Sequence, residues 1–359
     1  MKINIYIGPT NKYIKYLLNK KINKTEYYSL LGLAFDAEKN KYPVASTFKF
    51  DTLVVFASDY SSVTESVLYD FVEFIKFSNI STVYIQNPPR HILEEIKLHY
   101  SKSEIFITKY DYKKIDSETI KKFKEIAPNK IIGQDVALKS FTKFLLINNK
   151  LNRSKKPIVI LMYGPSGVGK TDTCRTLAQI IKENLFIKQF SMFQSNQYAD
   201  YLFGGKIQDR SLARDLMERQ SNILVFDEFD KCNSIMYSAF YELFDTGIFK
   251  DKNYEVDLKN TLIICTSNFH SQKEVYNSLG EPMYFRINGF IKYNSLTSKT
   301  STALANKFFD KYLSQLNTSE CKILDESGVK EKLLSNINRF SNVRQIENSV
   351  RNSIADVLK

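Results

Sequence analysis

The chain has 359 residues, of which 43% are apolar and 25% charged, and its formal net charge is +12 at pH 7. This length can hold two or three domains with buried cores, and no stretch is apolar over the ~18 residues that a membrane-spanning helix needs. The four cysteines, Cys174, Cys232, Cys265 and Cys321, are far apart, which argues against a disulfide framework or a zinc site. We therefore expect a cytoplasmic protein that does not bind membranes.

Residues 1–112 alternate strand-like and helix-like runs. The strand-like runs are "INIYIG", "TLVVFASD", "STVYIQ" and "EIFITKYD", and "SVTESVLYDFVEFIKFS" and "PRHILEEIKLHY" have apolar residues at helical spacing. The second strand is continuously apolar, as in parallel sheets that are covered on both faces. The pattern predicts a small parallel α/β domain over residues 1–112. Its sequence carries no recognisable chemistry, and we expect it to recruit a partner.

A charged, helix-like stretch follows, "YKKIDSETIKKFKEIAPNK". Its charged character and Pro128 near its end favour a linker over residues 113–130, with the second domain beginning near Ile131.

A nucleotide site is indicated by an apolar strand-like run, a glycine-rich turn and an amphipathic helix-like run in succession. The turn fits the pattern G-x-x-x-x-G-K-[ST] in full, which predicts a loop whose backbone N–H groups surround phosphates. Lys170 is expected to reach the outer phosphates, and the Thr171 hydroxyl to bind Mg²⁺. The phosphate-binding residues predicted by this pattern are Gly164, Pro165, Ser166, Gly167, Val168, Gly169, Lys170 and Thr171.

Acidic and polar residues follow two further buried strands. The run "NILVFDEFDK" ends its apolar part in Asp227 and Glu228. We expect Asp227 to hold Mg²⁺ directly or through water, and Glu228 to polarise the attacking water; Asp230 is expected to be structural. The run "NTLIICTSNF" ends near Asn268, which can hydrogen-bond the attacking water or the γ-phosphate.

These motifs together resemble those of the AAA+ ATPases, and most closely the Clp-type unfoldases, from about residue 131 to the C-terminus. "KIIGQDVALKSF" is similar to the family segment that lies against adenine, which implies Ile132 and Gly133 as adenine neighbours. The resemblance implies ATP and Mg²⁺ as cofactors, a large α/β domain over residues 131–297 and a small helical lid domain over residues 298–359.

Two arginines carry further implications of the resemblance. "RINGFIKYNSLT" is similar to the family stretch around its arginine finger, so Arg286 would reach the γ-phosphate of a neighbouring subunit. "FSNVRQIENSV" resembles the sensor-2 helix, with Arg344 in the role of its arginine, although it departs from the usual G-A-R. An arginine supplied by a neighbour makes hydrolysis depend on assembly, and the implied assembly is a homo-oligomeric ring, a hexamer.

The expected pore loop departs from the family pattern. Clp-type unfoldases grip substrate with an aromatic loop, usually G-Y-V-G, whereas residues 194–212 read "QSNQYADYLFGGKIQDRSL". Tyr198, Tyr201 and Phe203 can substitute for that loop or form a packing cluster, and Lys206 is the tip residue of what remains. The sequence has no protease-docking loop of the family type, so we expect no protease partner.

Three functions are compatible with these features. The first is an ATP-driven ring that remodels a protein partner recruited by residues 1–112. The second is an ATP-gated scaffold or switch that does not thread its substrate, which the short pore loop favours. The third is a nucleic-acid remodeller, which the +12 charge favours, although the sequence shows no recognisable nucleic-acid module.

Overall fold

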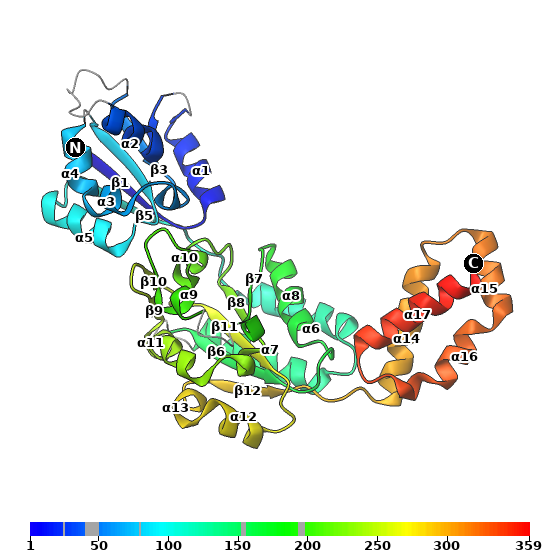
Figure 1. The fold of residues 1–359 in the computed structure, drawn as a ribbon. Coiled ribbons are helices and arrows are strands. Elements are labelled where there is room, and N and C mark those ends of the chain that lie inside the picture. Colours follow the sequence, from blue (N-terminus) through cyan, green and yellow to red (C-terminus); the bar gives the residue numbers. More distant parts are fainter. Residues whose placement is uncertain (24–25, 40–49, 79, 152–155, 193–197) are drawn as a thin grey trace. The chain divides into compact units, whose positions relative to one another are not determined.

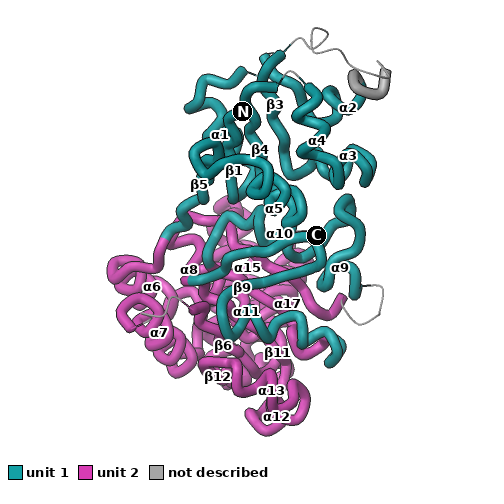
Figure 2. Tube along the Cα trace, turned by 90° about the vertical axis from the view of Figure 1, so that its left-hand side faces the viewer, with its two compact units in different colours: residues 1–113, 193–222, 233–259 teal, residues 114–192, 223–232, 260–359 magenta. Residues whose placement is uncertain are grey.

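The structure is a computed structural model of residues 1–359, and it describes all of them except 24–25, 40–49, 79, 152–155 and 193–197. The chain divides into two compact units (Figure 2). Unit 1 consists of residues 1–113, 193–222 and 233–259, and unit 2 of residues 114–192, 223–232 and 260–359. The two units are described separately below. Among the described residues, none of the helices combines the length and the apolar character needed to span a membrane.

Unit 1 contains a five-stranded parallel sheet with the order β2-β3-β4-β1-β5. Its strands are β1 (Lys2–Ile7), β2 (Tyr28–Ser29), β3 (Thr52–Val55), β4 (Thr82–Gln86) and β5 (Ile105–Lys109). Residues alternate between the two faces of a strand, and most residues on both faces of the central strands are apolar and buried. The predicted parallel α/β fold of the N-terminal region is therefore confirmed.

Helices cover both faces of this sheet (Figure 1). One face packs against α1 (Thr10–Asn19) through a cluster that includes Tyr6, Tyr13 and Leu17. The other face packs against helices that contribute to a larger apolar core. These helices are α2 (Leu30–Lys39), α3 (Glu65–Tyr69), α4 (Phe71–Phe77) and α5 (Arg90–His99).

Unit 1 also includes segments from the middle of the chain. These are α9 (Ala199–Phe203), α10 (Leu212–Met217), the 3₁₀ helix η6 (Ser234–Phe240), α11 (Tyr241–Thr246) and the antiparallel hairpin β9 (Ile248–Lys250) and β10 (Glu255–Asp257). The sequence assigned them to the large ATPase domain. They lie close to residues 1–113 within unit 1, and contacts such as the 2.7 Å hydrogen bond from the Arg90 amide to the Asn253 carbonyl join them to it.

Unit 2 contains a second five-stranded parallel sheet, with the order β12-β6-β11-β8-β7. Its strands are β6 (Ile158–Tyr163), β7 (Phe186–Gln189), β8 (Ile223–Asp227), β11 (Leu262–Ser267) and β12 (Gly289–Lys292). The helices of this part of unit 2 include α6 (Ser117–Lys130), α7 (Asp135–Lys150), α8 (Lys170–Ile181), α12 (Gln272–Leu279) and α13 (Glu281–Tyr284). Strands β6 and β11 are buried along their whole length, which explains why they read as continuous apolar runs.

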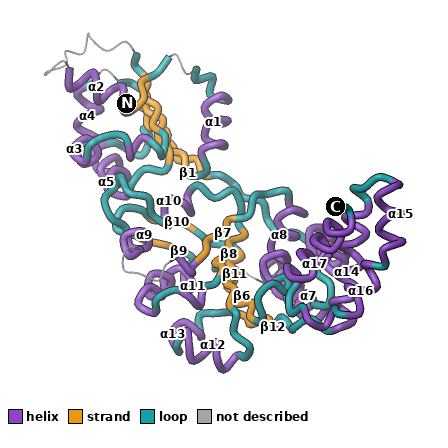
Figure 3. Tube along the Cα trace, turned by 45° about the vertical axis from the view of Figure 1, so that its right-hand side comes forward, coloured by secondary structure: helices purple, strands orange, loops and turns teal. Residues whose placement is uncertain are grey.

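The C-terminal part of unit 2 is helical from residue 298 onward, as the resemblance implies (Figure 3). Its helices are α14 (Ser298–Leu313), α15 (Thr318–Ser327), α16 (Val329–Ser335) and α17 (Val343–Val357). They enclose a core of their own, centred on residues such as Phe309, Ile346 and Val350.

The expected linker is corrected by the structure. Most of residues 113–130 form α6, which continues through Pro128 to Lys130. Ile120, Phe123 and Ala127 are buried in the core of unit 2. The helical character was expected from the sequence. The lysines of α6 occupy the exposed face of an amphipathic helix whose apolar face packs in unit 2, so the segment is part of that unit and not a linker.

Candidate nucleotide site

The glycine-rich loop lies between β6 and α8, as its sequence context predicts. Gly164 and Gly169 have φ values of 139° and 106°, which disfavour residues with a side chain. A Cβ atom on Gly164 would collide with the backbone of Tyr293, and one on Gly169 would lie 2.9 Å from the Ile131 side chain. The loop therefore needs glycine at both positions, and it leads into the positive end of the α8 dipole, which favours a bound phosphate.

Lys170, the first residue of α8, folds back over this loop. Its Nζ atom donates to the carbonyl oxygens of Gly164 and Pro165 at 2.6 and 2.8 Å, and to Asn268 Oδ1 at 3.2 Å. Burial lowers the pKa of the Lys170 ammonium to about 8, against the opposing effect of nearby carboxylates, of which Asp227 is the largest. The ammonium therefore lies in a partly desolvated position where a phosphate would restore its charge balance.

Asp227, the last residue of β8, and Thr171, in the first turn of α8, lie next to each other. Asp227 Oδ1 accepts hydrogen bonds from Thr171 Oγ1 at 3.2 Å and from Thr266 Oγ1 at 2.6 Å. A hydroxyl and a carboxylate are the oxygen ligands that Mg²⁺ prefers beside phosphates. The donor set present here therefore fits the Mg²⁺ that the sequence implies, with Thr171 and Asp227 as its protein ligands.

Glu228 follows Asp227 in a left-handed backbone conformation, with a φ of 53°. Such a conformation is costly for a non-glycine residue and is frequent at functional sites. The Glu228 amide donates to Thr266 Oγ1 at 3.0 Å, and Gln189 Nε2 donates to Glu228 Oε2 at 3.1 Å. Hydrogen bonds from Ser191 and then Gln189 lower the pKa of the Glu228 carboxyl, so it is ionised at neutral pH, as a proton acceptor must be.

Asp230 follows this pair in the sequence and is deeply buried. Its side chain is 1% exposed, and its Oδ2 atom lies 3.5 Å from Lys231 Nζ. Burial raises the pKa of Asp230. These properties set it apart from the more exposed Glu228 and agree with the structural role that was expected.

A hollow of about 350 Å³ lies beside the phosphate loop. Its wall includes Ile132 and Val168, together with Leu304 and Phe308 from α14. Gly133 is not in this wall; its φ is 81°, and a Cβ there would collide with Thr300. The hollow has the mixed apolar character of a base-binding site.

The two arginines lie at different places in unit 2. Arg286 follows α13, and its Nη1 atom donates to the Pro282 carbonyl at 2.7 Å. Arg344 is exposed in the first turn of α17. The preceding residue, Val343, donates its amide to the Gly167 carbonyl at 2.9 Å, so the start of α17 touches the phosphate loop.

The described part of the expected pore loop lies in unit 1. Residues 194–197 fall outside the described residues. Tyr201 is half-buried and donates to Asp215 Oδ2 at 2.6 Å, whereas Phe203 is 39% exposed. Lys206 is exposed and follows α9 closely. Of the three aromatic residues, Tyr201 is thus engaged in a polar contact.

Sequence reasoning missed the residues that hold the acidic pair in place. Thr266 bridges Asp227 and the Glu228 amide, and Gln189 and Ser191 bind the Glu228 carboxylate. All three lie at or just beyond the carboxyl ends of β11 and β7, the two strands that flank β8. The signal that could have found them is this position, since the carboxyl ends of parallel strands meet at one edge of the sheet.

Comparisons with known proteins agree with this geometry. The family described as "AAA domain (Cdc48 subfamily)" matches residues 155–317. The chaperone protein ClpB of Malacoplasma penetrans is 27% identical over 263 residues, which cover 63% of this chain and 36% of that protein. ClpB of Wolinella succinogenes is 31% identical over 160 residues (41% and 19%), and the AAA+ ATPase ClpV1 of Pseudomonas aeruginosa is 30% identical over 163 residues (42% and 18%).

The chain thus spans about a third or less of the length of these relatives. The family match begins at residue 155, so it leaves the N-terminal sheet of unit 1 outside.

Proposed function

We propose that residues 155–317, which match the AAA-domain family and are similar to the chaperone protein ClpB and the AAA+ ATPase ClpV1, act as a Clp-type AAA+ ATPase module that binds ATP with Mg²⁺ at the phosphate loop, hydrolyses the ATP and uses the turnover to remodel a protein partner. The observation that carries the proposal is the convergence of Lys170, Asn268 and the Asp227–Glu228 pair on one edge of the unit 2 sheet.

Each residue has a role that its contacts support. Lys170 would exchange its loop carbonyl partners for phosphate oxygens, and Asn268 would orient the attacking water. Glu228, whose pKa is lowered, would accept a proton from that water. Thr171 and Asp227 would hold Mg²⁺, which supplies charge neutralisation at the phosphates when it is bound. The hollow bordered by Ile132 would take the adenine, with Gly133 beside it.

We propose a homo-oligomeric, hexameric ring for the active assembly. Arg286 lies outside the Lys170 contact network described above, which suits a residue that acts on a neighbouring subunit. Arg344 would act in cis, because the start of α17 touches the phosphate loop. The lid over residues 298–359 would close on the nucleotide above the large domain of residues 131–297, and residues 1–112 would bind the partner.

An ATP-gated switch without threading is the second candidate. The observation that favours it is the contact of Tyr201 with Asp215, which keeps one of the expected pore aromatics half-buried. A remodeller presents such side chains to its substrate in every subunit, whereas a switch does not need them.

Stimulation of ATP hydrolysis distinguishes these functions. We expect a permanently unfolded protein to raise the turnover of the wild-type chain several-fold, and a Glu228→Gln variant to remain inactive under the same conditions. Turnover that does not respond to protein or nucleic acid would support the switch. Stimulation by single-stranded DNA or RNA with a steep loss at high salt would instead support nucleic-acid remodelling and contradict the proposal.

A further inference from the structure

Two charged side chains at the C-terminal end of α10 bind the edge of the sheet in unit 1. Arg214 and Glu218 are four residues apart, so they project from the same face of the helix. Strands β1, β3 and β4 belong to the same compact unit as α10. These contacts lie outside the nucleotide site. Arg214 and Glu218 belong to the region of the family match, whereas their partners at the sheet edge precede it in the sequence.

The Glu218 carboxylate accepts four hydrogen bonds from this edge. Its Oε2 atom accepts from the backbone amide and the hydroxyl of Thr10 at 2.7 and 2.8 Å. Its Oε1 atom accepts from Gln86 Nε2 at 2.8 Å and from Asn87 Nδ2 at 2.9 Å. Charge-assisted hydrogen bonds of this kind are stronger than those between neutral groups.

The orientation of both amide side chains is determined by backbone donors. Gln86 Oε1 accepts from the Ala57 amide at 3.2 Å, and Asn87 Oδ1 accepts from the Gly8 amide at 2.9 Å. Each side chain must therefore turn its NH₂ group toward Glu218. Each NH₂ group also donates to the Gly8 carbonyl, at 2.9 Å from Gln86 and 3.0 Å from Asn87, which leaves its second hydrogen for Glu218. Because Gln86 is fully buried and Asn87 is 2% exposed, that second hydrogen would be costly to leave without an acceptor.

The position in the sheet is one where parallel α/β domains bind ligands. The order β2-β3-β4-β1-β5 means that the chain leaves β1 toward one side and leaves β4 toward the other. Ligands bind outside the carboxyl ends of the strands at such a switch point. Thr10 is also the first residue of the ten-residue helix α1, whose positive dipole end favours a carboxylate.

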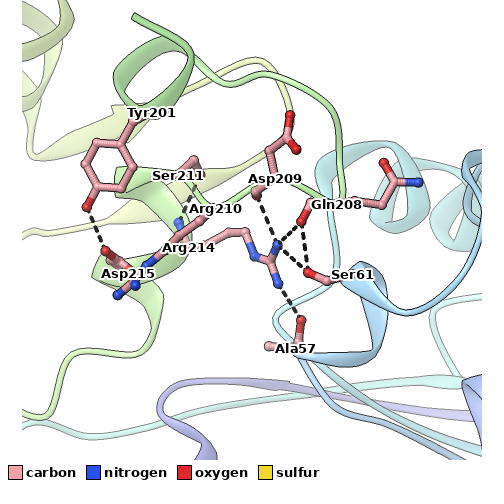
Figure 4. Close-up of polar contacts among 9 residues, drawn as sticks. All are labelled: Ala57, Ser61, Tyr201, Gln208, Asp209, Arg210, Ser211, Arg214 and Asp215. Atoms are coloured by element: carbon pink, nitrogen blue, oxygen red, sulfur yellow. Dashed lines mark hydrogen bonds and ion pairs between the residues drawn. The ribbon is translucent and has the colours of Figure 1, made fainter. Parts of the chain in front are cut away.

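Arg214 provides a second attachment to the same edge (Figure 4). Its Nη2 atom donates to the Ala57 carbonyl at 2.8 Å, and its Nη1 atom to Ser61 Oγ at 3.0 Å. Nη1 also lies 3.0 Å from the carbonyls of Gln208 and Asp209, which precede α10. The guanidinium thus joins the turn after β3 to the loop before α10.

We propose that the carboxyl edge of the N-terminal sheet is a carboxylate-binding site and that its occupant is Glu218 of the same chain. Glu218 is then a positioning residue: with Arg214 it docks α10 onto the N-terminal domain, and the chain continues from Glu218 into β8, which carries Asp227. The proposal does not depend on the function proposed above, because its test needs no nucleotide.

The site is reachable by a small carboxylate from outside. Glu218, Thr10 and Asn87 line a hollow of about 510 Å³. Acetate, which matches the part of the side chain that Glu218→Ala removes, can therefore serve as a probe of the vacated position.

The test is hydrogen exchange at the Thr10 amide in the full chain, measured at single-residue resolution. The first amides of a helix have no acceptor within the helix, so protection of this amide reports on Glu218. We expect at least about tenfold faster exchange in Glu218→Ala. We expect 50 mM acetate to restore most of the protection and chloride at equal ionic strength to restore none, where ~50 mM is chosen to fill a weak site of millimolar affinity.

Two further variants keep the result decisive. Glu218→Gln retains the shape but must turn an NH₂ group either toward the Thr10 amide or toward the amides of Gln86 and Asn87, so its protection at Thr10 should lie between those of the wild type and Glu218→Ala. The control Glu94→Ala removes an exposed carboxylate, 3.8 Å from Arg90, elsewhere in unit 1, and should leave exchange at Thr10 unchanged. Wild-type protection at Thr10 in Glu218→Ala, or exchange in Glu218→Ala that acetate does not slow, would overturn the proposal.

Discussion

The two parallel sheets of this chain end differently at their carboxyl edges. In unit 2 the edge carries a glycine-rich loop, the Lys170 ammonium and the Asp227–Glu228 pair. In unit 1 the corresponding edge carries the neutral donors of Thr10, Gln86 and Asn87. The first set suits an external polyphosphate with a metal ion, and the second suits a single carboxylate. One architecture can thus bind a soluble ligand or a side chain of its own, depending on a few residues after the strands.

Removing the cation from the unit 2 edge should have the largest effect. We expect Lys170→Ala to weaken ATP binding at least about 100-fold, because the variant loses the charged contact with the phosphates in a partly buried site. Isothermal titration with ATP and Mg²⁺ measures this directly. Lys156→Ala, which lies before β6 and outside the loop, serves as the control. ATP affinity equal to that of the wild type in Lys170→Ala would show that the edge is not a phosphate site.

Removing the arginine that is expected to act across subunits should have the next largest effect, because it leaves ATP binding intact and slows only hydrolysis. We expect Arg286→Ala to bind ATP normally and to hydrolyse it ~10³-fold more slowly, since an arginine supplied in trans stabilises the transition state. Mixing Arg286→Ala with Glu228→Gln should restore part of the turnover, because some interfaces then combine an intact Arg286 with an intact Glu228. Mixtures that never exceed the sum of the two variants would rule out the trans role.

The pH dependence of ATP binding should give the smallest effect. The pKa of Lys170 in the nucleotide-free chain is about 8, below its ordinary value of 10.5. Below pH 8 the ammonium is already charged, whereas above pH 8 a proton must be taken up on binding. Affinity should therefore be constant from pH 6.5 to 7.5 and fall as pH rises through 8, approaching about tenfold per pH unit.

A matched variant tests this assignment. Lys170→Arg keeps its charge throughout this range, so its affinity, whatever its level, should not show the decline. An equal decline in Lys170→Arg would assign the titration to another group.

Contiguous motifs made the unit 2 edge predictable from the sequence. The run from Gly164 to Thr171 and the strand that ends in Asp227 carry their context with them, so the positions of Lys170, Thr171 and Asp227 near one another were expected. The N-terminal sheet was also expected to be parallel, because its strands read as apolar runs separated by amphipathic helices.

The remaining features depend on contacts between distant parts of the chain. The contact of Glu218 with Thr10 and Gln86 joins residues far apart in sequence, and no local sequence pattern predicts it. Residues 117–130 read as helix-like but were assigned to a linker, because a charged helix that packs in a domain and one that joins two domains have similar composition. Their difference lies in the spacing of Ile120, Phe123 and Ala127, which forms one apolar stripe.

The most direct test of the nucleotide site is a parallel measurement of ATP binding and ATP turnover in the wild type and in Glu228→Gln. The account predicts equal affinity for ATP with Mg²⁺ and a turnover reduced ~10²- to 10⁴-fold in the variant, because only the proton acceptor is lost. A Glu228→Gln variant that hydrolyses ATP at the wild-type rate, or a wild-type chain that does not bind ATP, would contradict it.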